Sequence, residues 1–253
     1  MRPRNFMLNS NPHWTSAGKI RWLSFSPLQD FDFVTHGFII KNEEQYLATQ
    51  IKKNTIRRLF EKISSEERHI LVPQQVHGDG CVTIKKGDGL KKKYKGDAIL
   101  TDRRDILLTV SVADCLPIFL IDSQKKVVGL IHAGWRGTLL GTARESLRKA
   151  KNEFGCDPQN FTILLGPAIL RCCYEISEAI AILFDEDCLV RIPGEKPKLD
   201  LIYANVKQLL DCGVKRKKIF ATNECTCCNK DMFHSFRRDG DKAGRMIAFL
   251  GIK

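Results

Sequence analysis

The sequence lacks the features of exported and membrane-spanning proteins. Its 253 residues contain no long uncharged apolar segment, because the most apolar stretch, 106–121, includes Asp114 and Pro117 and is too short to span a bilayer. The N-terminal residues, MRPRNFMLNSNPHW, lack the apolar core of a signal peptide. We therefore expect a cytoplasmic protein without a membrane partner.

Nucleotide-binding loops are also missing. There is no Walker A loop and no strand–GxGxxG–helix unit, so ATP and dinucleotide cofactors are not expected. Lys and Arg outnumber Asp and Glu by 41 to 29, but lysine runs such as 91–93 and 215–218 do not alternate with aromatic residues. This pattern favours solvated loops over nucleic-acid binding, and it leaves open a small anionic partner such as phosphate.

Ten cysteines are many for a chain without an export signal. In a reducing compartment they are expected to be free thiols, metal ligands or a nucleophile rather than disulfides. Cys225 and Cys228 have C-x-x-C spacing, but a closed structural metal site would need a second such pair, and the sequence contains none. The sequence therefore predicts free thiols for Cys172, Cys173 and the cysteines of 225–228.

Short apolar runs bounded by turn residues alternate with segments of helical spacing. Strands are predicted over 31–40, 69–76, 82–84, 97–100, 106–112, 116–121, 127–131, 161–165, 218–221 and 246–250. Helices are predicted over 43–63, 139–154, 175–184 and 200–212, while residues 1–30 show no clear pattern. Without repeats or a domain break, we expect one α+β domain over 1–253 with a large sheet core.

Three residues that can ligate metals stand at or beside strand ends. A hairpin over 116–131 would bring Cys115 and His132 together, and His77 follows the strand predicted over 69–76. Two imidazoles and a thiolate, with one open position, form the ligand pattern of a catalytic zinc ion, which lowers the pKa of bound water towards ~7. Alternatively, Cys115 is a nucleophile with His132 as its base, a hydrolase dyad that leaves His77 unexplained.

Three neighbouring residues are further candidates for the chemistry. Asp114 would orient a ligand imidazole or the water, or else it caps the turn. Arg136 would bind an anion such as phosphate through a bidentate contact, or else it forms an ion pair that fixes the turn. Glu175 would move protons, or else it is a solvated residue in the first turn of a helix. The H-x-E and P-C-x-x-C signature of cytidine-type deaminases is absent.

At these residues the sequence resembles the multicopper polyphenol oxidoreductase, or laccase-domain, family, whose members are regarded as bacterial purine nucleoside phosphorylases that also deaminate adenosine. The resemblance covers most of the chain from His69 onward. It is carried by QQVHG at 74–78, GDAILTD at 96–102, SVADCLPIFLID at 111–122, VVGLIHAGWRGT at 127–138 and LGPAILRCCYEI at 165–176.

The resemblance implies a layered α/β sandwich of mixed sheets and one catalytic zinc ion held by His77, Cys115 and His132. It implies phosphorolysis of adenosine, inosine, guanosine and methylthioadenosine, together with deamination of adenosine. Purine nucleosides and phosphate are then the partners, and a homo-oligomer is left open. Copper, the metal of the older family name, is the alternative, although six histidines cannot build the copper motifs of true laccases.

The N-terminal part departs from the family pattern. Members usually carry HGFSTR and then a Gly-Gly segment, whereas residues 36–41 read HGFIIK and no such segment follows. The family arginine falls on Lys41, which keeps the charge but loses the bidentate fork. Lys41 and Arg136 are the predicted phosphate ligands. A basic binding protein that has lost catalysis is the alternative outside enzymes.

Overall fold

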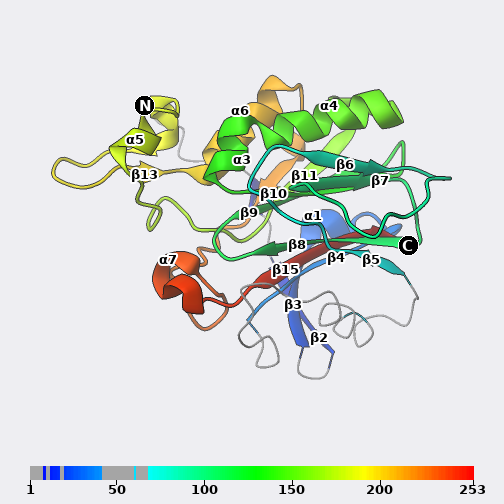
Figure 1. Cartoon of the computed structure of the whole chain (residues 1–253), viewed down its shortest axis with the longest axis horizontal. Coiled ribbons are helices and arrows are strands. Elements are labelled where there is room, and N and C mark those ends of the chain that lie inside the picture. Colours follow the sequence, from blue (N-terminus) through cyan, green and yellow to red (C-terminus); the bar gives the residue numbers. More distant parts are fainter. Residues whose placement is uncertain (1–7, 10–11, 18–19, 42–59, 61–67) are drawn as a thin grey trace.

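Two large mixed sheets pack face to face in the computed structural model, which describes residues 8–9, 12–17, 20–41, 60 and 68–253 (Figure 1). The seven-stranded sheet has the order β1 (Leu8–Asn9), β14 (Ile219–Ala221), β11 (Phe161–Leu165), β9 (Leu116–Asp122), β10 (Val127–Ala133), β7 (Ala98–Thr101) and β6 (Cys81–Ile84). The six-stranded sheet has the order β2 (Pro12–Ala17), β3 (Ile20–Phe25), β4 (Val34–Ile39), β15 (Met246–Ile252), β8 (Ile106–Val112) and β5 (His69–Leu71). Both sheets combine parallel and antiparallel pairs, as expected.

The central strands are apolar on both faces because each face is covered. On β9, Phe119 and Ile121 belong to the core between the two sheets, whereas Ile118 and Leu120 belong to the core on the other face. This is why the strand has no polar alternation over 116–121. Burial of each such side chain stabilises the fold by roughly 1.5–3 kcal/mol.

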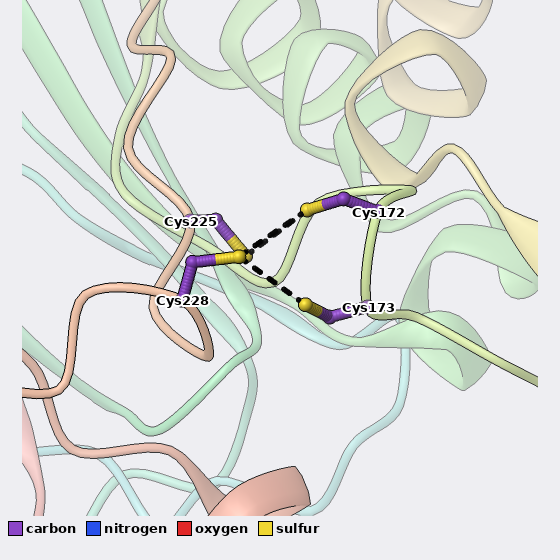
Figure 2. Close-up of side chains that lie close together, drawn as sticks. All are labelled: Cys172, Cys173, Cys225 and Cys228. Carbon is purple, nitrogen blue, oxygen red and sulfur yellow. Dashed lines mark hydrogen bonds between the residues drawn. The ribbon is translucent and has the colours of Figure 1, made fainter.

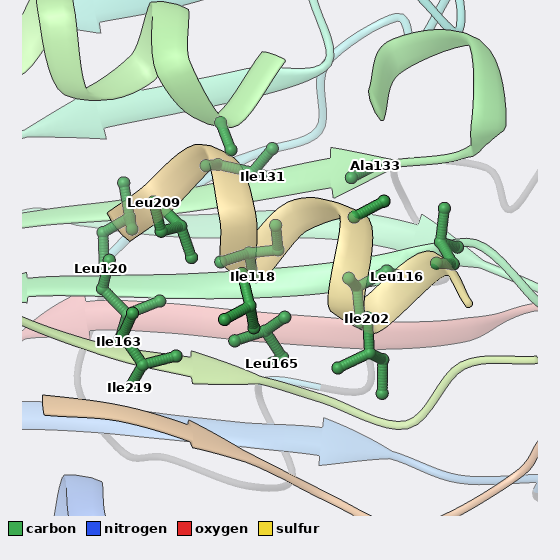
Figure 3. Close-up of a cluster of buried hydrophobic side chains, with 14 of the residues drawn as sticks. Leu116, Ile118, Leu120, Ile131, Ala133, Ile163, Leu165, Ile202, Leu209 and Ile219 are labelled. Atoms are coloured by element: carbon green, nitrogen blue, oxygen red, sulfur yellow. The ribbon is translucent and has the colours of Figure 1, made fainter. Parts of the chain in front are cut away.

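Helices cover the outer face of the seven-stranded sheet. They are α3 (Trp135–Leu140), α4 (Thr142–Phe154) and α6 (Leu201–Asp211), and Figure 1 shows them together on one side of this sheet. Ile202 and Leu209 of α6 lie over the isoleucines and leucines of β9, β10 and β11 in Figure 3. Asp200 begins α6 as predicted, since its side chain accepts the Tyr203 N–H at 3.0 Å.

The helix predicted over 139–154 is two helices. α3 begins at Trp135, four residues before the predicted start, and ends at Gly141 with φ 85°. That left-handed conformation suits glycine and lets the Gly141 N–H contact carbonyls at the end of α3 before α4 begins. Gly155, with φ 65°, ends α4 as predicted.

Other predicted boundaries were wrong. The helix predicted over 175–184 is shorter, because only α5 (Glu178–Ala181) is helical there. The strand predicted over 69–76 ends at Leu71, because Pro73 has no N–H group to donate to a neighbouring strand. Residues 1–30 contain β1, β2, β3 and α1 (Ser26–Gln29), none of which was predicted. The helix predicted over 43–63 lies outside the described residues apart from Phe60. The remaining elements are β12 (Leu189–Val190), β13 (Lys198–Leu199), α7 (Phe236–Asp239), and the 3-10 helices η2 (Pro158–Asn160), η3 (Glu186–Cys188), η4 (Arg216–Lys218) and η5 (Gly240–Lys242).

None of the helices among the described residues is both long and apolar enough to cross a bilayer.

His36 on β4 makes the stability of this fold depend on pH. Its Nε2 accepts the Phe25 N–H at 3.0 Å, and burial lowers its pKa from 6.5 to about 4. Between these values the unfolded chain binds a proton that the folded chain excludes, so the free energy of unfolding falls as pH falls. We expect a loss of about 2 kcal/mol between pH 6.5 and pH 5, measured by urea unfolding.

The matched variant is His36→Gln, which retains an acceptor but does not titrate. Its free energy of unfolding should fall less over the same pH interval, because other titrating groups are common to both proteins. Equal pH dependence in the two proteins would show that His36 takes up its proton freely in the folded state.

Candidate metal centre

The β9–β10 hairpin brings two of the predicted ligands together. Cys115 directly precedes β9, His132 lies next to the end of β10, and the antiparallel register pairs Leu116 with Ala133. His77 approaches from the loop after β5, and its ring centroid lies 4.8 Å from that of His132. One nitrogen or sulfur atom from each of the three residues lies within 4.8 Å of the others. The predicted convergence is thus present in the structure.

A buried carboxylate, Asp97, holds both histidines in place. One of its oxygens lies 2.9 Å from His132 Nδ1, and its oxygens also accept the main-chain N–H groups of His77 at 2.9 Å and Gly78 at 2.8 Å. This network keeps a proton on His132 Nδ1, so Nε2 is the nitrogen that would ligate a metal after it loses its own proton. Asp97 was not among the predicted site residues, although it lies in the GDAILTD stretch that carries the family resemblance.

Electrostatic interactions favour the charged form of the thiol. Burial alone would raise the pKa of Cys115, but the attraction of His132, with hydrogen bonds to His132 and His77, lowers it to about 6. Burial would lower the pKa of His132, whereas Cys115 and Asp97 raise it to about 9. These interactions favour the thiolate form of Cys115, which is the form that ligates a metal or attacks an electrophile.

The backbone around the three residues is tightly constrained. His77 has φ 58° and Asp114 has φ 85°, both in the left-handed region that ordinary side chains rarely adopt. A Cβ atom at Gly134 would lie 3.0 Å from Cys115 Sγ, so only glycine leaves the thiolate its full space. Strain of this kind is typical of functional sites, where the surrounding structure enforces the geometry.

The donor set fits a catalytic zinc ion. Two imidazoles and one thiolate supply three ligands, and Asp97 supplies the carboxylate that commonly orients a ligand imidazole. The same soft and borderline donors suit copper. Because all three side chains line a cavity, a fourth position can face a substrate.

The cavity has a volume of about 1280 Å³ and a basic wall. Arg136, predicted from the sequence, lines it and is exposed, with its guanidinium carbon 4.6 Å from the Trp135 ring centroid. Arg237, Arg245 and the lysines at 91–93 line it as well. The lysine run was predicted to be a solvated loop, because its local pattern does not indicate a cavity wall.

Lys41 lies elsewhere. It is not among the residues that line the cavity, and its Nζ is 3.4 Å from the carbonyl oxygen of Lys230. The structure therefore gives no geometric support to Lys41 as a phosphate ligand.

Asp114 lines the cavity, but its carboxylate faces the C-terminal part of the chain. It accepts hydrogen bonds from Thr226 Oγ1 at 2.6 Å, Ser235 Oγ at 3.0 Å and the Arg237 N–H at 2.6 Å. These bonds favour the structural alternative, in which Asp114 fixes residues 226–237 beside the cavity. The carboxylate that orients a ligand imidazole is Asp97.

Glu175 lines the cavity and is exposed. It does not begin a helix, because α5 starts at Glu178, and it forms an isolated β-bridge with Lys198 instead. The prediction of a first-turn helix residue was therefore wrong, and Glu175 presents a carboxyl group on the cavity wall.

Comparisons with known proteins agree with this architecture. A purine nucleoside phosphorylase of Clostridium acetobutylicum is 32% identical over 237 residues, which cover 92% of this chain and 97% of that protein. Purine nucleoside phosphorylase YlmD of Geobacillus stearothermophilus is 32% identical over 216 residues, covering 78% and 77%. The crystal structure of YlmD from that organism superimposes with a TM-score of 0.83 and 26% identity, over 96% of this chain and all of that one.

Residues 43–253 match the family model described as multi-copper polyphenol oxidoreductase laccase. The match includes the ligand-bearing hairpin, the loop of His77 and the basic residues of the cavity. The chain therefore belongs to the multi-copper polyphenol oxidoreductase laccase family.

Proposed function

We propose that this chain is a zinc-dependent purine nucleoside phosphorylase that also deaminates adenosine. The observation that carries the proposal is the position of His77, Cys115 and His132 on the wall of a large basic cavity. The names of the relatives support the phosphorylase activity. The proposed substrates are adenosine, inosine, guanosine and methylthioadenosine, with phosphate as the second substrate.

In phosphorolysis, a phosphate oxygen attacks C1′ of the ribose, the bond from C1′ to the purine nitrogen breaks, and the purine leaves with a proton. We assign phosphate binding to Arg136 and Arg237, because guanidinium groups bind phosphate through paired hydrogen bonds. Burial raises the pKa of Tyr174, so its hydroxyl stays protonated and can donate a hydrogen bond to a substrate in the cavity.

A bound zinc ion would supply a Lewis acid that polarises a substrate or water oxygen. We assign proton transfer to the Glu175 carboxyl, in both phosphorolysis and deamination. The other carboxylates near the site accept several hydrogen bonds each, Asp97 from the histidine loop and Asp114 from the C-terminal segment.

The second candidate is a hydrolase with a Cys115 nucleophile. The lowered pKa of Cys115 and its hydrogen bond to His132 favour it, because a thiolate beside an imidazole is the nucleophile of cysteine hydrolases. Chelation separates the two candidates. A zinc enzyme should lose turnover with a chelator and regain it with added zinc, whereas a cysteine hydrolase should keep its activity.

The direct test is turnover of the purified, zinc-loaded chain. Inosine should give hypoxanthine only when phosphate is present, and adenosine without phosphate should give inosine. Absence of turnover with all four nucleosides would overturn the proposal, and steeply salt-dependent nucleic-acid binding would then support the basic binding protein.

Arg136→Ala is expected to raise the KM for phosphate by about 10–100-fold, because a hydrogen bond to a charged group contributes roughly 1.5–3 kcal/mol. Inosine phosphorolysis at varied phosphate concentration measures this change. The KM of Arg136→Lys for phosphate should lie between those of Arg136→Ala and the wild-type protein. Arg148→Ala is the matched control, since Arg148 is an exposed arginine on α4 that pairs with Glu145. An unchanged KM in Arg136→Ala would exclude a phosphate contact.

A further inference from the structure

Four cysteines converge outside the site described above. Figure 2 shows Cys172 and Cys173 on one loop and Cys225 and Cys228 on another, with their sulfur atoms directed toward one another. All four Sγ atoms lie within 4.8 Å of each other. We call these four residues the cysteine cluster. The sequence contains no second C-x-x-C pair, but folding places the adjacent Cys172 and Cys173 where such a pair would stand.

The sulfur–sulfur distances have the size expected around a single metal ion. Cys172 Sγ lies 3.6 Å from the sulfur atoms of both Cys225 and Cys228, and Cys173 Sγ lies 3.3 Å from that of Cys228. A tetrahedral zinc ion with Zn–S bonds of about 2.3 Å has edges of about 3.8 Å between its sulfur ligands. These three distances are within about 0.5 Å of such an edge, and the remaining pairs lie within 4.8 Å.

The pattern of contacts also favours four sulfur ligands around one shared metal ion over two separate disulfides. Cys172 and Cys228 each contact two sulfur atoms at similar distances. A pair of disulfides would instead join the sulfur atoms two by two at about 2.05 Å. Closed sites with four cysteine ligands are the usual structural zinc sites of proteins.

Main-chain groups around the cysteine cluster suit a metal–thiolate centre. The N–H groups of Leu170 and Cys228 hydrogen-bond to Cys225 Sγ. Such hydrogen bonds orient a thiolate ligand and offset its charge. The two loops are also joined directly, because Thr226 N–H donates to the Ala168 carbonyl at 3.0 Å.

Two arginines lie beside the cysteine cluster, and Arg238 is also paired with Asp239. One zinc ion with four thiolates carries a net charge of −2. Arg237 donates to the Cys173 carbonyl at 3.4 Å, and Arg238 donates to the Cys227 carbonyl at 3.1 Å. Two guanidinium groups thus lie against the main chain of the two loops.

We propose that Cys172, Cys173, Cys225 and Cys228 bind one zinc ion in a closed structural site, separate from the centre of His77, Cys115 and His132. Both loops lead directly into the cavity wall. Tyr174 and Glu175 follow Cys173 and line the cavity, and Thr226, between the other two cysteines, donates to Asp114. The ion would therefore hold that wall in place without touching a substrate.

The test measures zinc in the full chain on a background that lacks the first centre. Cys115→Ala, desalted under reducing conditions, should contain about one zinc ion per chain by elemental analysis. Cys115→Ala combined with Cys228→Ser should contain none and should melt at a lower temperature. The matched control adds Cys212→Ser to Cys115→Ala, because Cys212 is a partly buried cysteine outside both groups, and it should keep the ion.

X-ray absorption at the zinc edge of the Cys115→Ala protein gives a second measurement, and it needs no substitution in the cysteine cluster. The expected shell is four sulfur atoms at about 2.3 Å. A shell with nitrogen or oxygen, a zinc-free Cys115→Ala protein, or cluster thiols that react only after reduction of a disulfide would each overturn the proposal. His77→Ala provides the same background if Cys115→Ala does not fold.

Because every sample carries Cys115→Ala and the compared variants differ only in one further cysteine, the result does not depend on whether the first centre of the wild-type protein binds zinc or catalyses phosphorolysis. A failure of the proposed function is seen as absent turnover in the wild-type protein, and a failure of the cysteine cluster as absent zinc in Cys115→Ala.

Discussion

Cys115→Ala is expected to lose the zinc ion proposed for the centre of His77, Cys115 and His132, and to reduce inosine phosphorolysis by about a thousandfold or more. The variant removes the only thiolate of a three-ligand set and leaves two imidazoles. A Lewis acid contributes several kcal/mol to a transition state, and about 4 kcal/mol corresponds to a thousandfold in rate. The two measurements are zinc per chain, which should be one ion lower in the variant than in the wild-type protein, and the phosphate-dependent release of hypoxanthine.

Cys212→Ala is the control for this prediction, since Cys212 is partly buried and lies outside both groups of ligands. It should keep wild-type metal content and turnover. If Cys115→Ala retains its metal at the histidines but loses activity, the cysteine nucleophile becomes the better mechanism. If Cys115→Ala retains both its metal and its activity, the three-ligand centre is not the active site.

The two residues of the hairpin could be placed from sequence because the geometry is local. Cys115 and His132 flank two apolar runs joined by a short polar turn, and an antiparallel hairpin necessarily brings its outer ends together. An α+β domain with a large sheet core was likewise predictable from apolar runs that alternate with helical segments, whereas the layered arrangement of mixed sheets was implied by the family resemblance. His77 required the further assumption that the strand predicted over 69–76 ends near this hairpin.

Asp97 shows where local pattern is insufficient. Its role depends on the pairing of β7 with β10, which joins segments about 30 residues apart, and on a turn that directs three N–H groups at one carboxylate. Asp114 was selected because it adjoins a ligand in sequence. Its left-handed backbone turns the carboxylate towards Thr226, Ser235 and Arg237 instead.

The cysteine cluster was missed for a related reason. The expected signature of a closed metal site is two C-x-x-C pairs, which is a rule about local spacing. The cysteine cluster instead combines an adjacent pair with one C-x-x-C pair more than 50 residues away. Parallel pairing of β11 with β14 brings the two loops together, since each loop follows the carboxyl end of its strand. Such long-range pairing cannot be inferred from spacing alone.

Asp97→Asn is expected to weaken zinc binding at the proposed centre of His77, Cys115 and His132 by about 10–100-fold, the usual effect of removing a carboxylate that orients a ligand imidazole. The amide has one acceptor oxygen, but the carboxylate contacts His132 Nδ1 and the N–H groups of Val76, His77 and Gly78. At least one buried donor then loses its partner, which costs roughly 1–3 kcal/mol of stability. Competition with a chromophoric chelator measures the affinity, and thermal unfolding measures the stability.

Asp114→Asn is the matched variant that isolates the effect on the metal. Both aspartates are buried and both accept several hydrogen bonds, so both variants should destabilise the fold by a similar amount. Among the described hydrogen bonds, Asp97 contacts the imidazole of His132, whereas Asp114 contacts no imidazole. Only Asp97→Asn should therefore change the zinc affinity. Equal losses of zinc affinity in both variants would mean that general loosening of the cavity, and not the orientation of His132, controls the metal site.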